Sequence, residues 1–296
     1  MNRVLVTGGT GFIGRHVLGP LVQRGFEVHA VGRRAGDAPD VRWHEADLLD
    51  GERRAALVTE VGASHLLHLA WHAEHGKFWT APENVDWVGA TSQLVREFAA
   101  GGGLRAVLAG SCAEYDWSAA SPLSESASAL RPATLYGVSK DATRRVVERL
   151  VDESAWGRIF FLYGPGEDER RLVSGVARRL VAGEPAAVSE GTQLRDFLHV
   201  SDVASAFVAL LDSDVTGAVN IASGQGVAVR DVAATIARAA GREDLLNVGT
   251  LPMRPDDPRE LVADVRRLES EVGWSPSLAL DAGISETVAW WRRMSR

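Results

Sequence analysis

The stretch VLVTGGTGFIG, from Val4 to Gly14, decides the fold of this chain. It places a short run of aliphatic and β-branched residues directly before a glycine-rich turn and the start of a helical pattern. Such glycines permit a tight turn, a close approach of the backbone to a pyrophosphate, and close packing of helix on strand. The helix N-terminus then offers free N–H groups and a partial positive charge to phosphates. The stretch predicts a dinucleotide site in which these residues contact the cofactor: Gly8, Gly11, Phe12, Ile13 and Gly14.

The rest of the chain up to about residue 160 alternates β-branched runs with helical stretches, which is typical of βαβ units around a parallel sheet. Strands are predicted at residues 3–7, 27–31, 65–69, 106–110 and 158–162, and helices at 13–24, 85–100 and 136–152. We therefore expect an α/β fold, a Rossmann-like doubly wound parallel sheet with a smaller C-terminal substrate-binding lobe. Residues 1–163 should form the NAD(P)-binding domain, with a strand and helix from about 195–222 returning to it, and residues 164–296 mainly the smaller lobe.

Composition excludes several classes of protein. With 46% hydrophobic and 24% charged residues among 296, the chain can bury a large core. A net charge of -7 argues against a nucleic-acid partner. No apolar run reaches the roughly 18 residues that span a membrane, and no signal peptide is visible, so a cytoplasmic protein is expected. The single cysteine, Cys112, excludes an internal disulfide and a cysteine-based metal cluster, and no metal is expected.

The end of the second predicted strand indicates which dinucleotide binds. A carboxylate there accepts the 2′-hydroxyl of NAD, whereas arginine suits the 2′-phosphate of NADP. Here Gly32 is followed by Arg33 and Arg34, so NADP is expected, with NAD as the alternative. Asp47 and Leu48, after the next apparent strand, are expected near the adenine. An exposed aspartate at a strand end would look the same in sequence.

A tyrosine and a lysine, Tyr136 and Lys140, stand four residues apart on a predicted helix, so their side chains share one face. A neighbouring ammonium favours the tyrosinate and brings its pKa toward the range useful for proton transfer. Only two lysines, Lys77 and Lys140, occur among 32 basic residues, so a position that keeps lysine has a specific need for it. Ser111, at the end of another predicted strand, could hydrogen-bond the same substrate oxygen. The three residues form a candidate catalytic set.

These residues and the glycine turn resemble the extended short-chain dehydrogenase/reductase family, of the NAD-dependent epimerase/dehydratase type. Ser111 precedes Tyr115 by four residues and Tyr136 by 25, and the later segments 163–166 and 195–203 also match the family's motifs. The resemblance implies a nucleotide-sugar substrate and a homodimer paired through the helices at 85–100 and 136–152. It also implies that Leu69 and Ala70 lie near the nicotinamide ribose, where Tyr136 and Lys140 also contact the cofactor.

The resemblance further assigns a substrate side. Arg195 and Arg254 occupy places where relatives hold the nucleotide diphosphate, and Ser111 and Cys112 would face the sugar. Dehydrating relatives carry Asp and Glu directly after the catalytic hydroxyl, but this chain has Cys112 and Ala113, which disfavours dehydration. Phe161 stands where many relatives have a substrate-contacting Asn.

With one proton-transfer group and a predicted NADP site, reduction of a carbonyl is the simplest chemistry. We therefore expect an NADPH-dependent 4-ketoreductase of a nucleotide-activated, dTDP-linked 4-keto-6-deoxyhexose. The sugar nucleotide comes from the resemblance, and the residues alone give only carbonyl reduction. The alternatives are a nucleotide-sugar C4 epimerase with tightly bound NAD and a reductase of a non-sugar carbonyl.

Overall fold

A seven-stranded parallel sheet forms the centre of the computed structural model, which describes residues 2–253 and 255–295. The strand order is β10-β6-β5-β4-β1-β2-β3. Every pair of neighbours is parallel. The strands are β1 (Arg3–Thr7), β2 (Glu27–Gly32), β3 (Val41–Glu45), β4 (His65–His68), β5 (Arg105–Ser111), β6 (Ser154–Ile159) and β10 (Gly217–Ile221). The expectation of a Rossmann-like α/β fold is confirmed.

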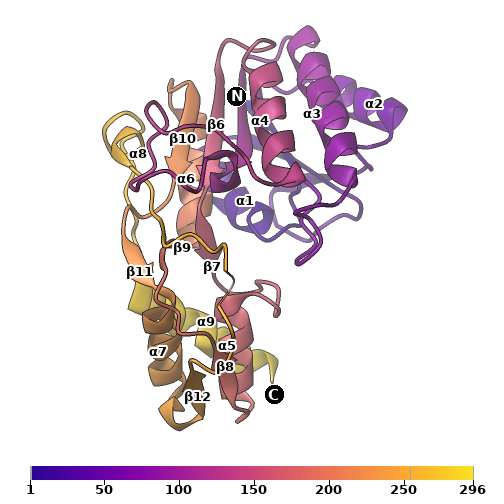
Figure 1. The fold of residues 1–296 in the computed structure, drawn as a ribbon. Helices are drawn as coiled ribbons and strands as arrows, with labels where there is room; N and C mark the ends of the chain where they lie inside the picture. The colour runs from indigo at the N-terminus through magenta and orange to yellow at the C-terminus, as the bar shows by residue number, and fades with distance from the viewer. Residues whose placement is uncertain (1, 254, 296) are drawn as a thin grey trace.

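Helices cover both faces of this sheet (Figure 1). On β1, Val4 and Val6 join a core with α1 (Gly14–Gln23) and α6 (Val200–Asp212). Leu5, between them, faces the opposite core with α2 (Gly51–Val61), α3 (Glu83–Ala100) and α4 (Leu135–Val147). Because successive strand residues point to opposite faces, a strand with two apolar faces must be covered on both. This explains why β1 reads as a continuous apolar run.

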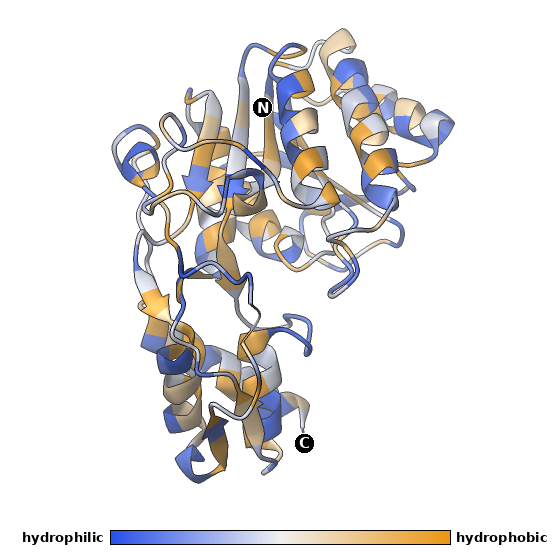
Figure 2. Cartoon of the chain, viewed as in Figure 1, coloured by the Kyte–Doolittle hydropathy of each residue, from blue (hydrophilic) through white to orange (hydrophobic). Residues whose placement is uncertain are grey.

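A smaller part of the molecule lies below the carboxyl edge of the large sheet (Figure 1). Its sheet has the order β11-β9-β13, and β7 also pairs with β9. These strands are β7 (Phe161–Tyr163), β9 (Leu194–His199), β11 (Gly226–Ala228) and β13 (Glu260–Leu261). A two-stranded sheet joins β8 (Ala186–Val188) to β12 (Leu246–Val248). The helices of this part are α5 (Leu172–Val181), α7 (Val229–Ala240) and α9 (Leu280–Met294), whereas α8 (Arg266–Ser270) packs beside β10 of the large sheet. The apolar sides of α5, α7 and α9, orange in Figure 2, pack together in a separate hydrophobic core.

The chain passes between the two parts at a place where the strand prediction was wrong. Instead of one strand at 158–162, β6 ends at Ile159 and β7 begins at Phe161. Phe160 is buried with Leu123 and Ala222 between the two strands. Its N–H still donates to the carbonyl oxygen of Ile221 at 3.2 Å. The apolar run therefore divides between two sheets, which periodicity alone cannot distinguish from one long strand.

The helix predicted at 136–152 is also shorter in the structure. Helix α4 ends at Val147, and Leu150 donates its N–H to the carbonyl oxygen of Val147, three residues back.

Within the described ranges, no helix is both long and apolar enough to cross a bilayer.

Candidate active site

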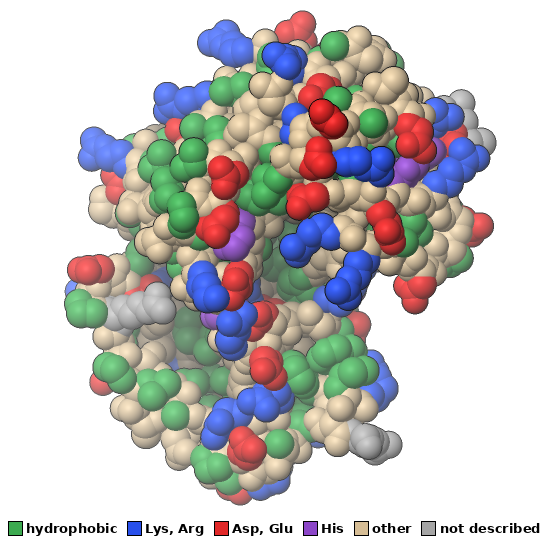
Figure 3. All heavy atoms as spheres, turned by 90° about the vertical axis from the view of Figure 1, so that its right-hand side faces the viewer, with side chains coloured by type: hydrophobic (Ala, Val, Ile, Leu, Met, Phe, Trp, Pro, Cys, Tyr) green, Lys and Arg blue, Asp and Glu red, His purple; other side chains and the backbone are tan. Residues whose placement is uncertain are grey.

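A cavity of about 1240 Å³ opens at the carboxyl ends of β1, β2, β4 and β5, where the large sheet meets the smaller part. The chain leaves β1 toward β2 on one side and returns to β4 on the other, so the crevice lies at the point where the strand order reverses. Ligands of such sheets bind at this point. Figure 3 shows the surface hollowed between the larger and smaller parts, with charged side chains around the opening.

The glycine turn after β1 lines one end of this cavity together with Phe12 and Ile13. Gly8 has φ of +70°, and a Cβ there would lie 2.9 Å from the backbone nitrogen of Ala70. A Cβ on Gly14 would overlap the carbonyl oxygen of Gly8. Gly14 is also the first residue of α1 and lines the cavity, so the N-terminus of this helix borders it. This backbone fits the pyrophosphate of a dinucleotide, which needs a close approach and N–H donors.

The residues predicted to select the cofactor lie at the end of β2 and after β3. Both arginines are exposed, and of the two Arg33 lines the cavity. Asp47 and Leu48 both line the cavity. The Asp47 carboxylate accepts the N–H of Leu49 at 3.0 Å, and the Leu48 side chain is buried. Of the two arginines, Arg33 is therefore the one that borders the cavity.

His68, at the end of β4, fixes the floor of the cavity beneath Leu69 and Ala70. Its Nδ1 lies 2.7 Å from the Thr7 hydroxyl and its Nε2 lies 3.0 Å from the Thr91 hydroxyl. The Thr7 oxygen also accepts the N–H groups of Leu69 and Ala70, each at 3.2 Å. Burial lowers the pKa of His68 to about 3, so the ring is neutral. Leu69 and Ala70 therefore reach the cavity, as expected, on a backbone tied to β1.

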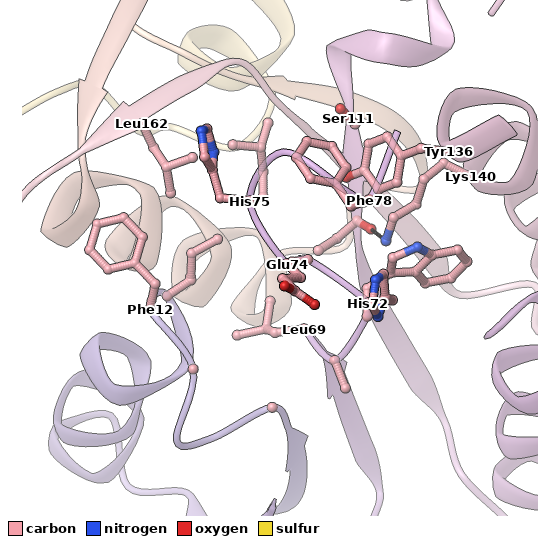
Figure 4. A pocket seen from close by; sticks show the side chains of 18 of the residues that line it. Phe12, Leu69, His72, Glu74, His75, Phe78, Ser111, Tyr136, Lys140 and Leu162 are labelled. Atoms are coloured by element: carbon pink, nitrogen blue, oxygen red, sulfur yellow. Dashed lines mark hydrogen bonds between the residues drawn. The ribbon is translucent and has the colours of Figure 1, made fainter. Parts of the chain in front are cut away.

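Ser111 and Tyr136 both line this cavity and lie near each other in it (Figure 4). Ser111 is the last residue of β5, and Tyr136 lies in the first turn of α4, which Thr134 caps by accepting the N–H of Gly137. The Ser111 side chain lies close enough to the Tyr136 hydroxyl to act to lower its pKa. Burial is the main reason that the pKa of Tyr136 is raised, so the phenol keeps its proton at neutral pH. The pair can present one O–H donor and one further hydroxyl to a carbonyl oxygen.

Lys140 lies one turn after Tyr136 on the same side of α4 and is only 3% exposed. Its Nζ donates to the carbonyl oxygen of Ala109 on β5 at 2.8 Å. Burial lowers the pKa of the ammonium to about 7, and the carboxylate of Glu114 opposes this shift. The structure thus brings together the three residues predicted as catalytic.

The substrate residues predicted from the resemblance fall into three situations. Cys112 and Phe161 line the cavity, and burial raises the pKa of the Cys112 thiol to about 12, so the thiol stays protonated. Strand β5 ends at Ser111, and Cys112 is the first residue of the short helix η1 (Cys112–Glu114). Arg195 also lines the cavity, but its guanidinium pairs with Asp257 at 2.6 Å and stacks over Phe161. Arg254 lies outside the described residues.

Sequence reasoning missed the aromatic wall around Tyr136. Phe78 lies 4.9 Å and Trp79 5.8 Å from the Tyr136 ring, and Trp117 lies 5.9 Å from Trp79. These residues line the cavity, as do Trp71, Glu167, Arg170 and Arg171. The dense aromatic content of residues 71–79 was the available signal. Nothing in that segment has helical or strand periodicity, and so it reads as an ordinary loop.

Residues 4–222 match the model of the NAD dependent epimerase/dehydratase family. The chain is 28% identical to the UDP-glucose 4-epimerase of Streptomyces lividans over 98% of its own length and 96% of the relative's. It is 24% identical to the dTDP-4-dehydro-6-deoxyglucose reductase of Escherichia coli, over 97% of this chain and 96% of the relative. The structure of MoeE5 in complex with UDP-glucuronic acid and NAD has a TM-score of 0.84 and 31% identity, covering 99% of this chain and all of that one.

Proposed function

Because this chain belongs to the NAD-dependent epimerase/dehydratase family of nucleotide-sugar enzymes, we propose that it is an NADPH-dependent 4-ketoreductase of a dTDP-linked 4-keto-6-deoxyhexose. The observation that carries the proposal is that Ser111, Tyr136 and the buried Lys140 line one cavity together with the glycine turn. This set supplies one proton at the position where a carbonyl would be reduced.

NADP is the cofactor that we propose for this cavity. The glycine turn provides the close backbone approach that the pyrophosphate needs, and Arg33 borders the cavity at the end of β2. A guanidinium there suits a 2′-phosphate, because its fork of N–H donors matches phosphate oxygens. Asp47 and Leu48 would border the adenine. When bound, the dinucleotide supplies hydride to the carbonyl carbon.

The protein's own groups would complete the reduction at the carbonyl oxygen. Tyr136 keeps its proton at neutral pH and donates it as negative charge develops on that oxygen. Ser111 donates a second hydrogen bond to the same oxygen and stabilises the charge. Lys140 would hold the ribose hydroxyls, and its positive charge would ease proton loss from Tyr136.

Dehydration at C4 to C6 is a less suitable reaction for this cavity. It would need acid and base groups beside Ser111 to move protons at the neighbouring carbons. Cys112 has its pKa raised to about 12 and Ala113 has no ionisable group, so neither exchanges protons near neutral pH.

The aromatic wall supports a deoxygenated sugar. Phe78, Trp79 and Trp117 stand around Tyr136, and Phe161 lies in the same cavity. A hexose that keeps its 6-hydroxyl would have to desolvate it against these rings, whereas a 6-methyl group gains apolar contact. The similarity to the reductase of Escherichia coli points in the same direction.

A C4 epimerase with tightly held NAD is the second candidate. It would use the same three residues, and two observations favour it: MoeE5 was solved with NAD, and the epimerase of Streptomyces lividans is similar over nearly the whole chain. The reductase consumes NADPH, whereas the epimerase regenerates its cofactor in each turnover.

The test is to incubate the purified protein with NADPH and a panel of dTDP-4-keto-6-deoxyhexoses and to follow the absorbance of the reduced nicotinamide. The proposal expects absorbance to fall in proportion to the keto sugar supplied. Parallel samples contain UDP-glucose without added NADPH. If UDP-galactose forms there while no keto sugar oxidises NADPH, the epimerase is the correct assignment.

A further inference from the structure

The ammonium of Lys140 lies against the face of an indole. Its Nζ is 3.7 Å from the centre of the Trp71 ring, whereas the rings of Tyr136 and Trp156 are each 5.9 Å away. Trp71 follows Ala70 in the loop after β4, and the carbonyl oxygen of Ala109, at 2.8 Å, belongs to β5. The ammonium is therefore held between a ring from one strand end and a backbone oxygen from the next.

Trp71 is fixed by contacts that do not involve the lysine. Its Nε1 donates to the Asn84 side-chain oxygen at 2.8 Å. Asn84 is fully buried, and its own amide donates to the carbonyl oxygens of Phe78 and Ala81 at 2.7 and 2.8 Å. The ring also packs against Trp87, with centroids 6.0 Å apart. The plane of the indole is thus set before any ligand arrives.

A buried ammonium needs more than one neutral acceptor to stay charged. The carboxylate that supports its charge, Glu114, is already paired with Arg158 at 2.7 Å. The face of an indole carries negative electrostatic potential and attracts a cation most strongly where water is excluded. Lys140 is in that situation, because it is almost fully buried.

We propose that Trp71 is a positioning residue for Lys140: its indole face keeps the buried ammonium charged and fixed on the carbonyl oxygen of Ala109 before the dinucleotide binds. The functional consequence rests on the role proposed above for Lys140. The state of the ammonium itself can be measured without cofactor or substrate, so the two proposals can fail separately.

The experiment uses the fact that the chain has only two lysines. Competitive acetylation of the cofactor-free protein over a range of pH, read by mass spectrometry of the two lysine peptides, gives the pKa of Lys140. The side chain of Lys77 is 69% exposed and serves as the internal standard for reagent reactivity. In the parent protein we expect Lys140 to titrate near 7.

The informative variants are Trp71→Phe, which keeps an aromatic face, and Trp71→Leu, which keeps the site apolar without one. Trp71→Phe should leave the pKa of Lys140 close to its parent value, and Trp71→Leu should lower it by about one unit. Trp71→Met, a second non-aromatic variant, should behave as Trp71→Leu does. Trp117→Leu removes another cavity tryptophan and should leave the titration of Lys140 unchanged.

Equal titration of Lys140 in Trp71→Phe, Trp71→Leu and Trp71→Met would overturn the proposal, because a merely structural role gives no reason for aromatic and aliphatic side chains to differ. If Trp71→Leu and Trp71→Met do not fold, the Phe variant still decides: a Lys140 pKa more than one unit from the parent's would also overturn it. NADPH affinity, measured by fluorescence, should follow the same order, with the Leu variant weaker than the Phe variant.

Discussion

Glu114 and Arg158 form an ion pair of 2.7 Å directly behind Ser111, with side chains 0% and 1% exposed. The other oxygen of Glu114 accepts the N–H of Ser111 and the indole N–H of Trp156, each at 2.8 Å. Arg158 in turn donates to the Tyr115 hydroxyl at 3.2 Å. One buried carboxylate thus fixes the end of β5 on which Ser111 stands.

Arg158→Met should therefore destabilise the protein by about 3–5 kcal/mol, because it leaves the Glu114 carboxylate buried without its cation. The free energy of unfolding in urea at neutral pH measures the effect. The matched control is Arg24→Met, which breaks a pair with Asp212 of 2.6 Å at the surface and should cost less than about 1 kcal/mol. Equal losses in the two variants would show that the buried pair has no special weight.

His68 should make the protein sensitive to acid. Its pKa in the folded protein is about 3, below the ordinary value of 6.5, so the unfolded chain binds a proton between these values and the folded protein does not. The free energy of unfolding is therefore highest above pH 6.5 and decreases as the pH falls toward 3. The contribution of His68 to this decrease is up to about 1.4 kcal/mol per pH unit.

The measurement is urea unfolding at several pH values in this window for the parent and for His68→Gln, which cannot take up this proton. The variant should lose stability at neutral pH, since the bridge between Thr7 and Thr91 changes, but its stability should depend less on pH. Parallel pH profiles for the two proteins would contradict the assignment to His68.

Arg33 should decide the preference between cofactors. Arg33→Ala should weaken NADPH binding by about 1.5–3 kcal/mol, the contribution of a hydrogen bond to a charged group, and leave NADH binding nearly unchanged. Arg34→Ala is the matched control, because Arg34 is the neighbouring arginine outside the cavity lining, and it should leave the preference for NADPH nearly unchanged. Fluorescence titrations give the affinities. If the parent binds NADH and NADPH equally, the NADP proposal fails.

Helices α3 and α4 lie side by side and expose apolar residues, and we propose that they form the interface of a homodimer (Figure 1). Val85 on α3 is 59% exposed, and Val138 and Val146 on α4 are 48% and 39% exposed. Light scattering should give about twice the chain mass of 31.8 kDa for the parent. Val138→Arg should shift the protein toward the monomer, whereas Leu251→Arg, at an exposed leucine in the smaller part, should not. A parent mass near that of one chain would contradict the proposal.

The sequence predicted the parts of this molecule that depend on local pattern. The run before Gly8 and the glycine spacing predict β1, the turn and α1, because each needs only neighbouring residues. The Tyr136 and Lys140 spacing likewise places two side chains on one helical face. Ser111, 25 residues before Tyr136, was added from its place at the end of a predicted strand, and the resemblance to a family supported that choice.

The parts that could not be predicted depend on contacts between distant segments. Packing between elements sets three such features: the contact of the Lys140 ammonium with the Trp71 ring, the ion pair of Arg195 with Asp257, and the division of the apolar segment around Phe160 into two strands. Apolar periodicity has no information about which loop covers a strand end. Burial also reversed one electrostatic expectation, because desolvation raises the pKa of Tyr136 and outweighs the lowering effects of Ser111 and Arg171.

The most direct test of the reductase proposal is the fate of a deuterium label. The parent and Tyr136→Phe are incubated with a dTDP-4-keto-6-deoxyhexose and NADPH carrying deuterium at the transferable position, and the sugar product is examined by mass spectrometry and NMR. The parent should give a dTDP-6-deoxyhexose with one deuterium at C4, and Tyr136→Phe should give the same product roughly a hundred- to ten-thousandfold more slowly. A sugar that remains the 4-keto compound without deuterium at C4, with no loss of NADPH, would contradict the account.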